Sequence, residues 1–132
     1  MITTARSSQR QELFDILYSL SEGKGFKTFS KLPMADVGYP FVVIGDGNQT
    51  GQSHGKFKIN GQLSTRLDVW GEQNNRGSHD LLMFQLEQEM LNLKQLKTVY
   101  VKLDGITSNV VKLDEGQERL LHGTIDVTYT YY

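Results

Sequence analysis

The sequence contains no cysteine, only two prolines and almost no net charge. Without cysteine the chain cannot form a disulfide scaffold, a thiolate zinc site, an iron–sulfur centre or a cysteine nucleophile. Its 14 Lys and Arg side chains stand against 15 Asp and Glu, which gives a formal net charge of -1. Dedicated nucleic-acid binders and basic membrane-surface proteins carry an excess of positive charge, so the composition argues against both classes.

Long hydrophobic runs are also lacking. The longest runs, such as Phe41-Val42-Val43-Ile44, are far shorter than the roughly 20 residues that cross a bilayer. Residues 1–6 lack the apolar core of a signal peptide, so we expect a soluble protein that does not follow a secretory route. With 132 residues, 38% of them hydrophobic, the chain is expected to form one domain over 1–132 around a single core.

The first half of the chain predicts a helix and a hairpin. Apolar residues recur with helical spacing over 13–20, which predicts a helix from a cap at Ser7 or Ser8 to a stop at Gly23. A strand is expected over 39–46 and a second, with period-two alternation, over 57–71. Between them, residues 45–55 hold four glycines and no aliphatic residue. We therefore expect a long, flexible, exposed loop at the tip of this hairpin.

The second half predicts a helix followed by strands. Ser78 is a good N-cap for a helix that runs to about residue 93. Short strands are expected over 98–104 and 109–113, then a turn over 114–117 and a strand over 119–132 with the clearest alternation in the chain. Helices that do not alternate strictly with strands indicate an α+β fold. We predict a mostly antiparallel sheet packed by two helices, with one long β-hairpin loop.

No motif for catalysis or metal binding emerges from the residues. The glycine-rich segment has no Lys-Ser/Thr after it and no helix follows it, so it does not match a phosphate-binding loop. The histidines His54, His79 and His122 lack the spacing of a metal motif. No Gly-x-Ser-x-Gly sequence is present. The sequence therefore predicts neither an enzyme nor a metal site.

Aromatic and basic residues suggest a contact surface instead. Arg66, Trp70 and Arg76 could form a nucleic-acid patch, but two arginines and one tryptophan are few for that role. A tryptophan at a strand end is more often at the edge of the core or in a subunit contact. The tyrosine-rich C-terminal strand is expected either to pair inside the sheet or to offer its edge to a neighbour.

Four features, taken in order, resemble those of phage tail-terminator and tail-completion (head–tail joining) proteins. The run Tyr39-Pro40-Phe41-Val42-Val43-Ile44-Gly45-Asp46 is similar to that family's Tyr-Pro-x-hydrophobic-x-x-Gly signature. Leu67-Asp68-Val69-Trp70 is similar to the triplet that ends the family's next strand. A helix over 78–93 follows, and His122-Gly123 opens the late strand. The order of these features carries the resemblance, which covers nearly the whole chain.

The resemblance implies a virion structural protein: a ring, commonly a hexamer, at the head-proximal end of a tail tube. Such a ring ends tube polymerisation and provides the head–tail joining surface. The implied partners are further copies of the chain, the tail-tube protein and a head-connector or adaptor protein. DNA passes through the lumen without specific binding, and no membrane and no cofactor are involved. The implied location is the virion tail at the head–tail junction, after assembly in the cytoplasm of a bacterial host.

We predict the oligomer and partner contacts on the glycine-rich segment and on two residues of the following strand. The predicted contact residues are Asp46, Gly47, Asn48, Gln49, Thr50, Gln52, His54, Arg66 and Trp70. The lack of aliphatic residues leads us to expect that the segment orders on assembly, where it faces the tube or the connector.

Two alternatives stay open. Another small phage or prophage protein, such as a connector or tail-tube subunit, shares these features, and a tube subunit would polymerise into tubes instead of closing a ring. The other alternative is a small α+β enzyme or ligand-binding module. That alternative needs a pocket or bound metal formed by convergent polar residues. The candidates for such a pocket are His79, Asp80, His122 and Asp126.

Overall fold

The computed structural model of the chain describes residues 8–53 and 59–132, which form two α-helices, one short 3-10 helix and six strands. The helices are α1 (Gln9–Gly23), η1 (Gln73–Asn75) and α2 (Arg76–Asn92). The strands are β1 (Thr28–Phe29), β2 (Phe41–Ile44), β3 (Asn48–Ser53), β4 (Ile59–Glu72), β5 (Val101–Glu115) and β6 (Glu118–Tyr131). This arrangement is the predicted α+β fold.

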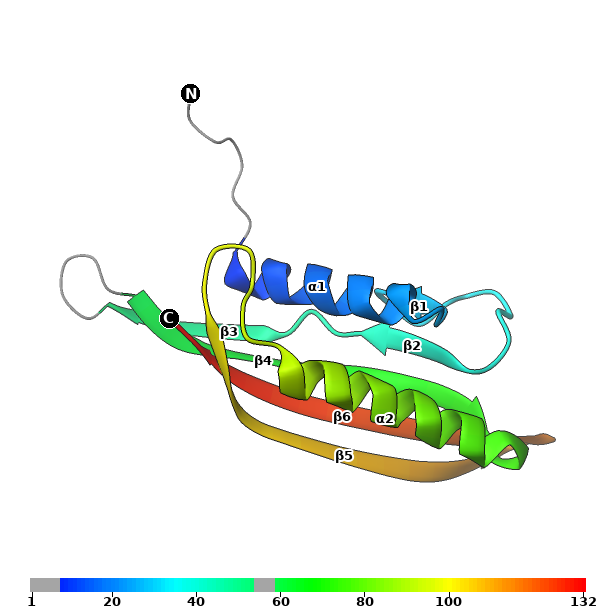
Figure 1. Cartoon of the computed structure of the whole chain (residues 1–132). Helices are drawn as coiled ribbons and strands as arrows, with labels where there is room; N and C mark the ends of the chain where they lie inside the picture. The colour runs from blue at the N-terminus through cyan, green and yellow to red at the C-terminus, as the bar shows by residue number, and fades with distance from the viewer. Residues whose placement is uncertain (1–7, 54–58) are drawn as a thin grey trace.

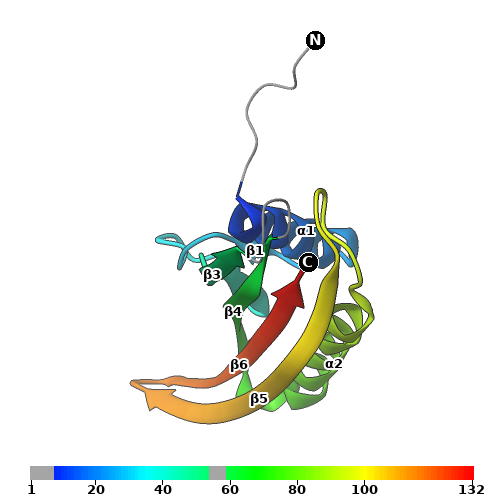
Figure 2. The same cartoon turned by 90° about the vertical axis from the view of Figure 1, so that its left-hand side faces the viewer.

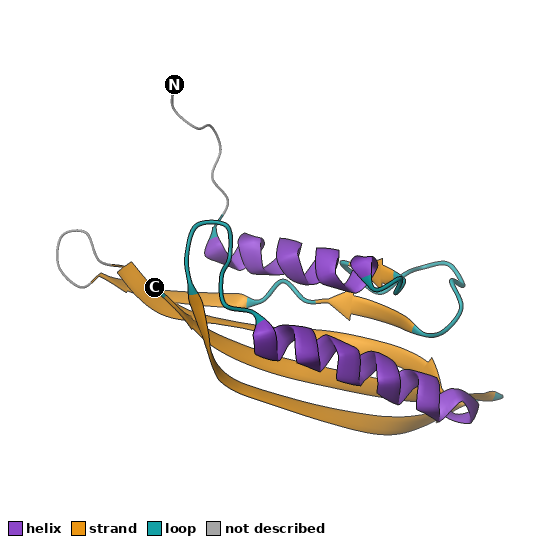
Figure 3. Cartoon of the chain, viewed as in Figure 1, coloured by secondary structure: helices purple, strands orange, loops and turns teal. Residues whose placement is uncertain are grey.

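One sheet contains all six strands (Figure 1). Its order is β1-β2-β4-β6-β5, and β3 pairs with β4 beyond the end of β2. Only the β1–β2 pair is parallel. Both α-helices pack on the same face of the sheet, α1 over the side of β1 to β3 and α2 over β4 and β6 (Figures 2 and 3).

The first helix begins and ends where the sequence predicts. Ser8 is the N-cap, and its Oγ accepts a hydrogen bond from the Gln11 backbone N–H at 3.1 Å. The helix ends at Gly23. Leu13 and Leu17 are buried in the core, one turn apart on the stripe that faces the sheet. Helical spacing of apolar residues therefore located this element correctly.

The core lies between the helices and alternate residues of the two central strands. Leu67 on β4 pairs with Ile125 on β6, and neither is exposed to solvent. Leu63 pairs in the same way with Tyr129, whose hydroxyl donates a hydrogen bond of 2.6 Å to the Met90 carbonyl on α2. Because side chains alternate along a strand, the residues between them point to the other face.

Two glycines allow α2 to approach this sheet closely. The buried His79 ring fills the space beside Gly71 and Gly123, and its Nε2 lies 2.8 Å from the Val69 carbonyl oxygen. A Cβ on Gly123 would stand 2.3 Å from the sulfur of Met83 and 2.9 Å from the His79 ring. Any larger residue at 123 would force the Met83 side chain or the His79 ring to shift.

The expected loop over 45–55 is wrong for most of its length. Residues Asn48–Ser53 form β3, antiparallel to β4, while His54 and Gly55 lie outside the described residues. A strand pairs through its backbone and does not need apolar side chains. Gly51 lies opposite Gly61, where a Cβ would come within 1.9 Å of the Thr50 carbonyl oxygen. The glycines that led us to expect a loop therefore allow the backbones of β3 and β4 to pair closely at this point.

The join between β2 and β3 is a bulge. Ile44 pairs with Leu67 and Asn48 with Ser64, so three residues (45–47) lie opposite two residues of β4. The Gly45 N–H still donates to the Arg66 carbonyl at 2.9 Å. Gly47 has a φ of +78°, a conformation that glycine adopts readily. One extra residue thus kinks the edge strand without ending its pairing.

Two other expected boundaries also differ. The strands expected over 98–104 and 109–113 are one strand, β5, with a register shift between Leu103 and Gly105. Pairing with β6 along its whole length keeps it extended, which local sequence could not reveal. The second helix begins at Arg76 with Asn75 as its cap, because η1 leads directly into it, and Ser78 lies inside its first turn. The turn predicted over 114–117 is shorter: Gly116, at a φ of +61°, and Gln117 form it, while Asp114 and Glu115 still pair as the end of β5.

Candidate interaction surface

The face of the sheet away from the helices, here called the open face, carries polar and aromatic side chains. It is formed by residues such as Arg66, Asp68 and Trp70 of β4 and by the β6 residues that pair with them, Asp126, Thr124 and His122. Strand alternation predicts this division correctly, since the intervening residues of both strands are buried. Within 8–53 and 59–132, no helix covers the open face (Figure 2).

Trp70, His122 and Asp68 form a compact cluster on this face. Trp70 and His122 are paired across β4 and β6, and their rings stack with centroids 4.0 Å apart and an interplanar angle of 4°. His122 Nε2 lies 2.8 Å from Asp68 Oδ1. The carboxylate fixes the imidazole and the imidazole fixes the indole, so the tryptophan is held rigidly although it is only half-buried.

Arg66 and Asp126 form a two-pronged ion pair in the middle of the open face. Arg66 Nε donates to Asp126 Oδ1 at 2.8 Å, and Nη2 donates to Oδ2 at 3.2 Å. The hydrogen bond and the charge of Asp126 raise the pKa of the arginine. Their side chains are 58% and 45% exposed, so solvent screens the pair and it contributes little to stability. The pair instead presents a defined polar pattern to the surroundings.

The predicted contact residues fall into separate groups. Gly47, Asn48 and Arg66 line a shallow hollow of about 420 Å³ beside the bulge, together with Asp126 and Thr128. Asp46 is exposed next to the hollow. Trp70 lies further along β4, toward the end that leads into η1. The structure therefore brings part of the predicted set together and leaves the tryptophan in different surroundings.

The other residues of the glycine-rich segment have different positions. Gln49 turns toward α1: its Nε2 donates to Gln9 Oε1 at 2.8 Å and to the Tyr131 hydroxyl at 3.3 Å. Its Oε1 accepts from the Arg10 backbone N–H at 2.9 Å, so Gln49 ties β3 to the helix. Thr50 is exposed on β3, and the Gln52 backbone pairs with Asn60. His54 lies outside the described residues.

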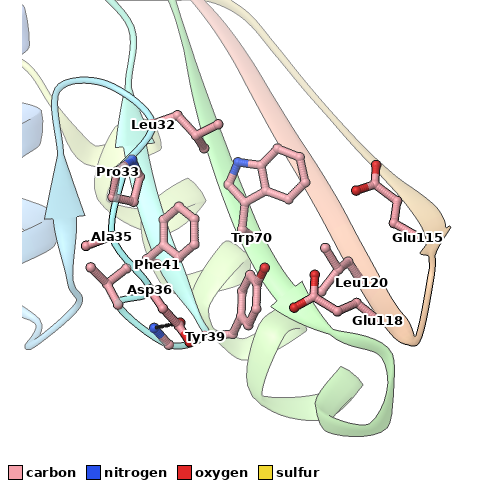
Figure 4. Close-up of a pocket in the computed structure, with 12 residues that line it drawn as sticks. Leu32, Pro33, Ala35, Asp36, Tyr39, Phe41, Trp70, Glu115, Glu118 and Leu120 are labelled. Atoms are coloured by element: carbon pink, nitrogen blue, oxygen red, sulfur yellow. Dashed lines mark hydrogen bonds between the residues drawn. The ribbon is translucent and has the colours of Figure 1, made fainter.

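A pocket of about 350 Å³ opens around Trp70 (Figure 4). The loop before β2 supplies Leu32, Asp36 and Tyr39, the strands supply Phe41, Trp70 and Leu120, and the β5–β6 turn supplies Glu115 and Glu118. Burial, followed by the charges of Glu118, Asp36, Glu72 and Glu115, raises the pKa of Tyr39. Sequence reasoning missed this pocket because its walls come from three separated segments.

The four polar residues named as a possible pocket for an enzyme or a metal do not come together. His79 lies on the helix face with its Nε2 against the Val69 carbonyl, while His122 lies on the open face with Asp68. Asp80 is exposed on α2, and Asp126 is bound to Arg66. Throughout 8–53 and 59–132, no three His, Asp or Glu side chains gather in a way that could hold a metal ion.

Sequence reasoning also missed exposed apolar residues on α2. Leu81 is 55% exposed and Phe84 is 52% exposed, and Leu91 is exposed further along the helix. These three positions follow helical spacing on the side opposite the buried Leu82, Leu86 and Met90. The spacing of a second apolar stripe, on the side of α2 opposite the core stripe, was therefore visible in the sequence.

No protein-family model matches this sequence, and none of the curated proteins matches it. Among solved structures, the fold is similar to a chain from the virion of a native gene transfer agent (GTA) particle. The superposition has a TM-score of 0.51 at 12% sequence identity, and it covers 93% of this chain and 87% of the other. At this identity the likeness is one of fold, and it extends over nearly all of both chains. No helix among the described residues is long and apolar enough to cross a membrane.

Proposed function

We propose that this chain is a virion structural protein that closes the head-proximal end of a phage-type tail tube as an oligomeric ring. In this role it stops tube polymerisation and offers the joining surface for the head. It acts by fitting against copies of itself and neighbouring virion proteins, and it transforms no substrate.

The likeness in fold to a virion chain, over 93% of this chain, is the observation that supports the proposal most. The order of the tail-terminator motifs in the sequence supports it independently, since fold comparison makes no use of those motifs. The open face adds a physical reason: a sheet face with a rigid aromatic cluster and an exposed ion pair is suited to contact.

We assign the partner contacts to the bulge and the open face, with Asp46, Asn48, Arg66 and Trp70 as their main residues. A ring forms when one surface of each copy binds a different surface of the next copy and the rotation between copies closes. The sheet offers two edges of different character, a kinked edge at β3 and a long edge at β5 that has one register shift between Leu103 and Gly105. Tail tube and head connector then meet the surfaces that ring closure leaves free.

Mass measurement in solution and negative-stain electron microscopy test this proposal. We expect the full chain to form closed rings, alone or when mixed with tube protein from the same genome, and we expect these rings at one end of each tube. If the chain instead polymerises into tubes, it is a tube subunit. If it neither forms rings nor binds tube ends, the proposal is wrong.

Two charge reversals locate the surface. Arg66→Glu places a negative charge beside Asp126 on the open face, whereas Lys24→Glu breaks a matched exposed pair with Glu89 (3.0 Å) on the helix side. Both variants should fold, because each breaks one solvent-accessible ion pair and water screens the like-charge repulsion that replaces it. We expect Arg66→Glu to abolish ring formation or tube capping and Lys24→Glu to retain both. The opposite result would move the interface to the helix side.

A further inference from the structure

The pocket around Trp70 combines an aromatic interior with an acidic rim. Tyr39 and Phe41 stack with ring centroids 5.6 Å apart, and Trp70 lies beside Phe41 as its partner on the neighbouring strand (Figure 4). Leu32 and Leu120 complete the apolar wall. The volume of about 350 Å³ is large enough for one long side chain and too small for a folded element.

The rim of the pocket is negative, and no ion pair among the described residues involves its carboxylates. Asp36, Glu115 and Glu118 line the opening, and Glu72 is close enough to act on Tyr39. Ion pairs within the described residues use other carboxylates, those of Asp68, Glu89, Asp114 and Asp126. The Lys27 ammonium group donates to the carbonyls of two residues that line the pocket, Val37 at 2.7 Å and Gly38 at 3.2 Å. Burial, and after it the charges of Glu118, Asp36, Glu72 and Glu115, raises the pKa of Tyr39, so the second of these causes agrees with a negative rim.

We propose that this pocket binds an arginine side chain presented by a segment of a partner protein. A guanidinium group stacks on aromatic rings and is attracted by their faces, while its N–H groups reach several carboxylates at once. A phosphate or a nucleic acid would be repelled by the same rim, and a purely apolar side chain would leave the carboxylates unused. This inference does not depend on the proposed tail role, because it concerns only the chemistry of the pocket.

Trp70 is the only tryptophan in the chain, so its fluorescence reports on this pocket and on the His122 ring stacked against it. The probe is the peptide acetyl-Gly-Arg-Gly-amide, and its neutral match carries citrulline in place of arginine. We expect the arginine peptide to change the fluorescence in a saturable way and the citrulline peptide to leave it unchanged. In NMR spectra, amide shifts should concentrate in residues 32–39 and at Leu120. Equal responses to both peptides, or shifts elsewhere, would overturn the proposal.

Matched carboxylate variants test the acidic rim. The double variant Glu115→Gln/Glu118→Gln should raise the Kd of the arginine peptide by about fivefold or more. The control Glu22→Gln/Glu87→Gln removes the same charge on the helix side and should change Kd by less than about twofold, since distant surface charges are screened. None of these four side chains makes a hydrogen bond or ion pair within the described residues, so both variants should fold. Equal Kd values in the two would contradict the proposal.

Discussion

The two faces of the sheet differ sharply although the same strands build them. On β4, Leu67 is 0% exposed under the helices, whereas the adjacent Arg66 side chain is 58% exposed on the open face. On β6, the buried Ile125 alternates in the same way with Asp126. The buried residues of the two strands therefore hold the fold together, and the residues between them are exposed and available for contact. The substitutions below test how much the helix face contributes to stability, with matched controls at exposed or open positions.

The largest effect is expected from Leu67→Ala. It leaves a cavity at the centre of the helix face and should lower the free energy of unfolding by about 2–5 kcal/mol. The neighbouring Arg66→Ala removes only a solvent-exposed pair and should cost less than about 1 kcal/mol. Urea denaturation of both variants measures the difference. Similar losses in the two variants would mean that the open face also carries the fold.

A smaller loss is expected from Gly123→Ala, which places a methyl group against Met83 and His79. Overpacking of this kind should lower the free energy of unfolding by about 1–3 kcal/mol. Gly105→Ala is the matched control, because nothing lies within 4 Å of a Cβ at that position on β5. Thermal unfolding compares the two. An undisturbed Gly123→Ala protein would show that α2 does not depend on close approach to the sheet.

The smallest of the three losses is expected from Tyr129→Phe, which removes the hydrogen bond to the Met90 carbonyl and should cost about 1 kcal/mol at neutral pH. Burial raises the pKa of Tyr129 above its ordinary 10.0, so the unfolded state loses the proton first as pH rises. The stability that the buried, protonated Tyr129 contributes is therefore fully present below pH 10.0 and is lost as the pH rises above it. Denaturation at rising pH should show a weaker fall for Tyr129→Phe than for Tyr132→Phe, an exposed control. Equal slopes would contradict the role of burial.

Local patterns in the sequence predicted the faces of the sheet but not its edges. Alternation in β4 and β6 assigned Leu67 and Arg66 to opposite faces, and helical spacing located α1, because both signals arise from neighbouring residues. The glycine-rich β3 was missed since its pairing depends on Gly61, ten residues after Gly51. The continuity of β5 was missed because it depends on pairing with β6, which follows only after the turn and leaves no signal in the local sequence of β5.

The positions of some residues on the open face were predictable, while their role in contact stays a prediction. Arg66 and Trp70 were identified as contact candidates from their residue types, and both lie on the open face. The pocket beside Trp70 was not predictable, because Tyr39 and Glu118 are separated by most of the chain and meet only through the sheet order β2-β4-β6. Residue type can nominate a contact, but only the fold shows which residues share it.

The lengths of tail tubes test most directly whether this chain caps a tail tube through its open face. Tube protein is assembled with the wild-type chain or with Arg66→Glu, after denaturation has shown that the two have similar stability, and tube lengths are measured by electron microscopy. With the wild type we expect tubes of limited length, each closed by a ring. With the variant we expect tubes of unrestricted length. Unrestricted tubes with the wild type would contradict the tail role, and equal capping by Arg66→Glu would contradict the assignment of contact to the open face.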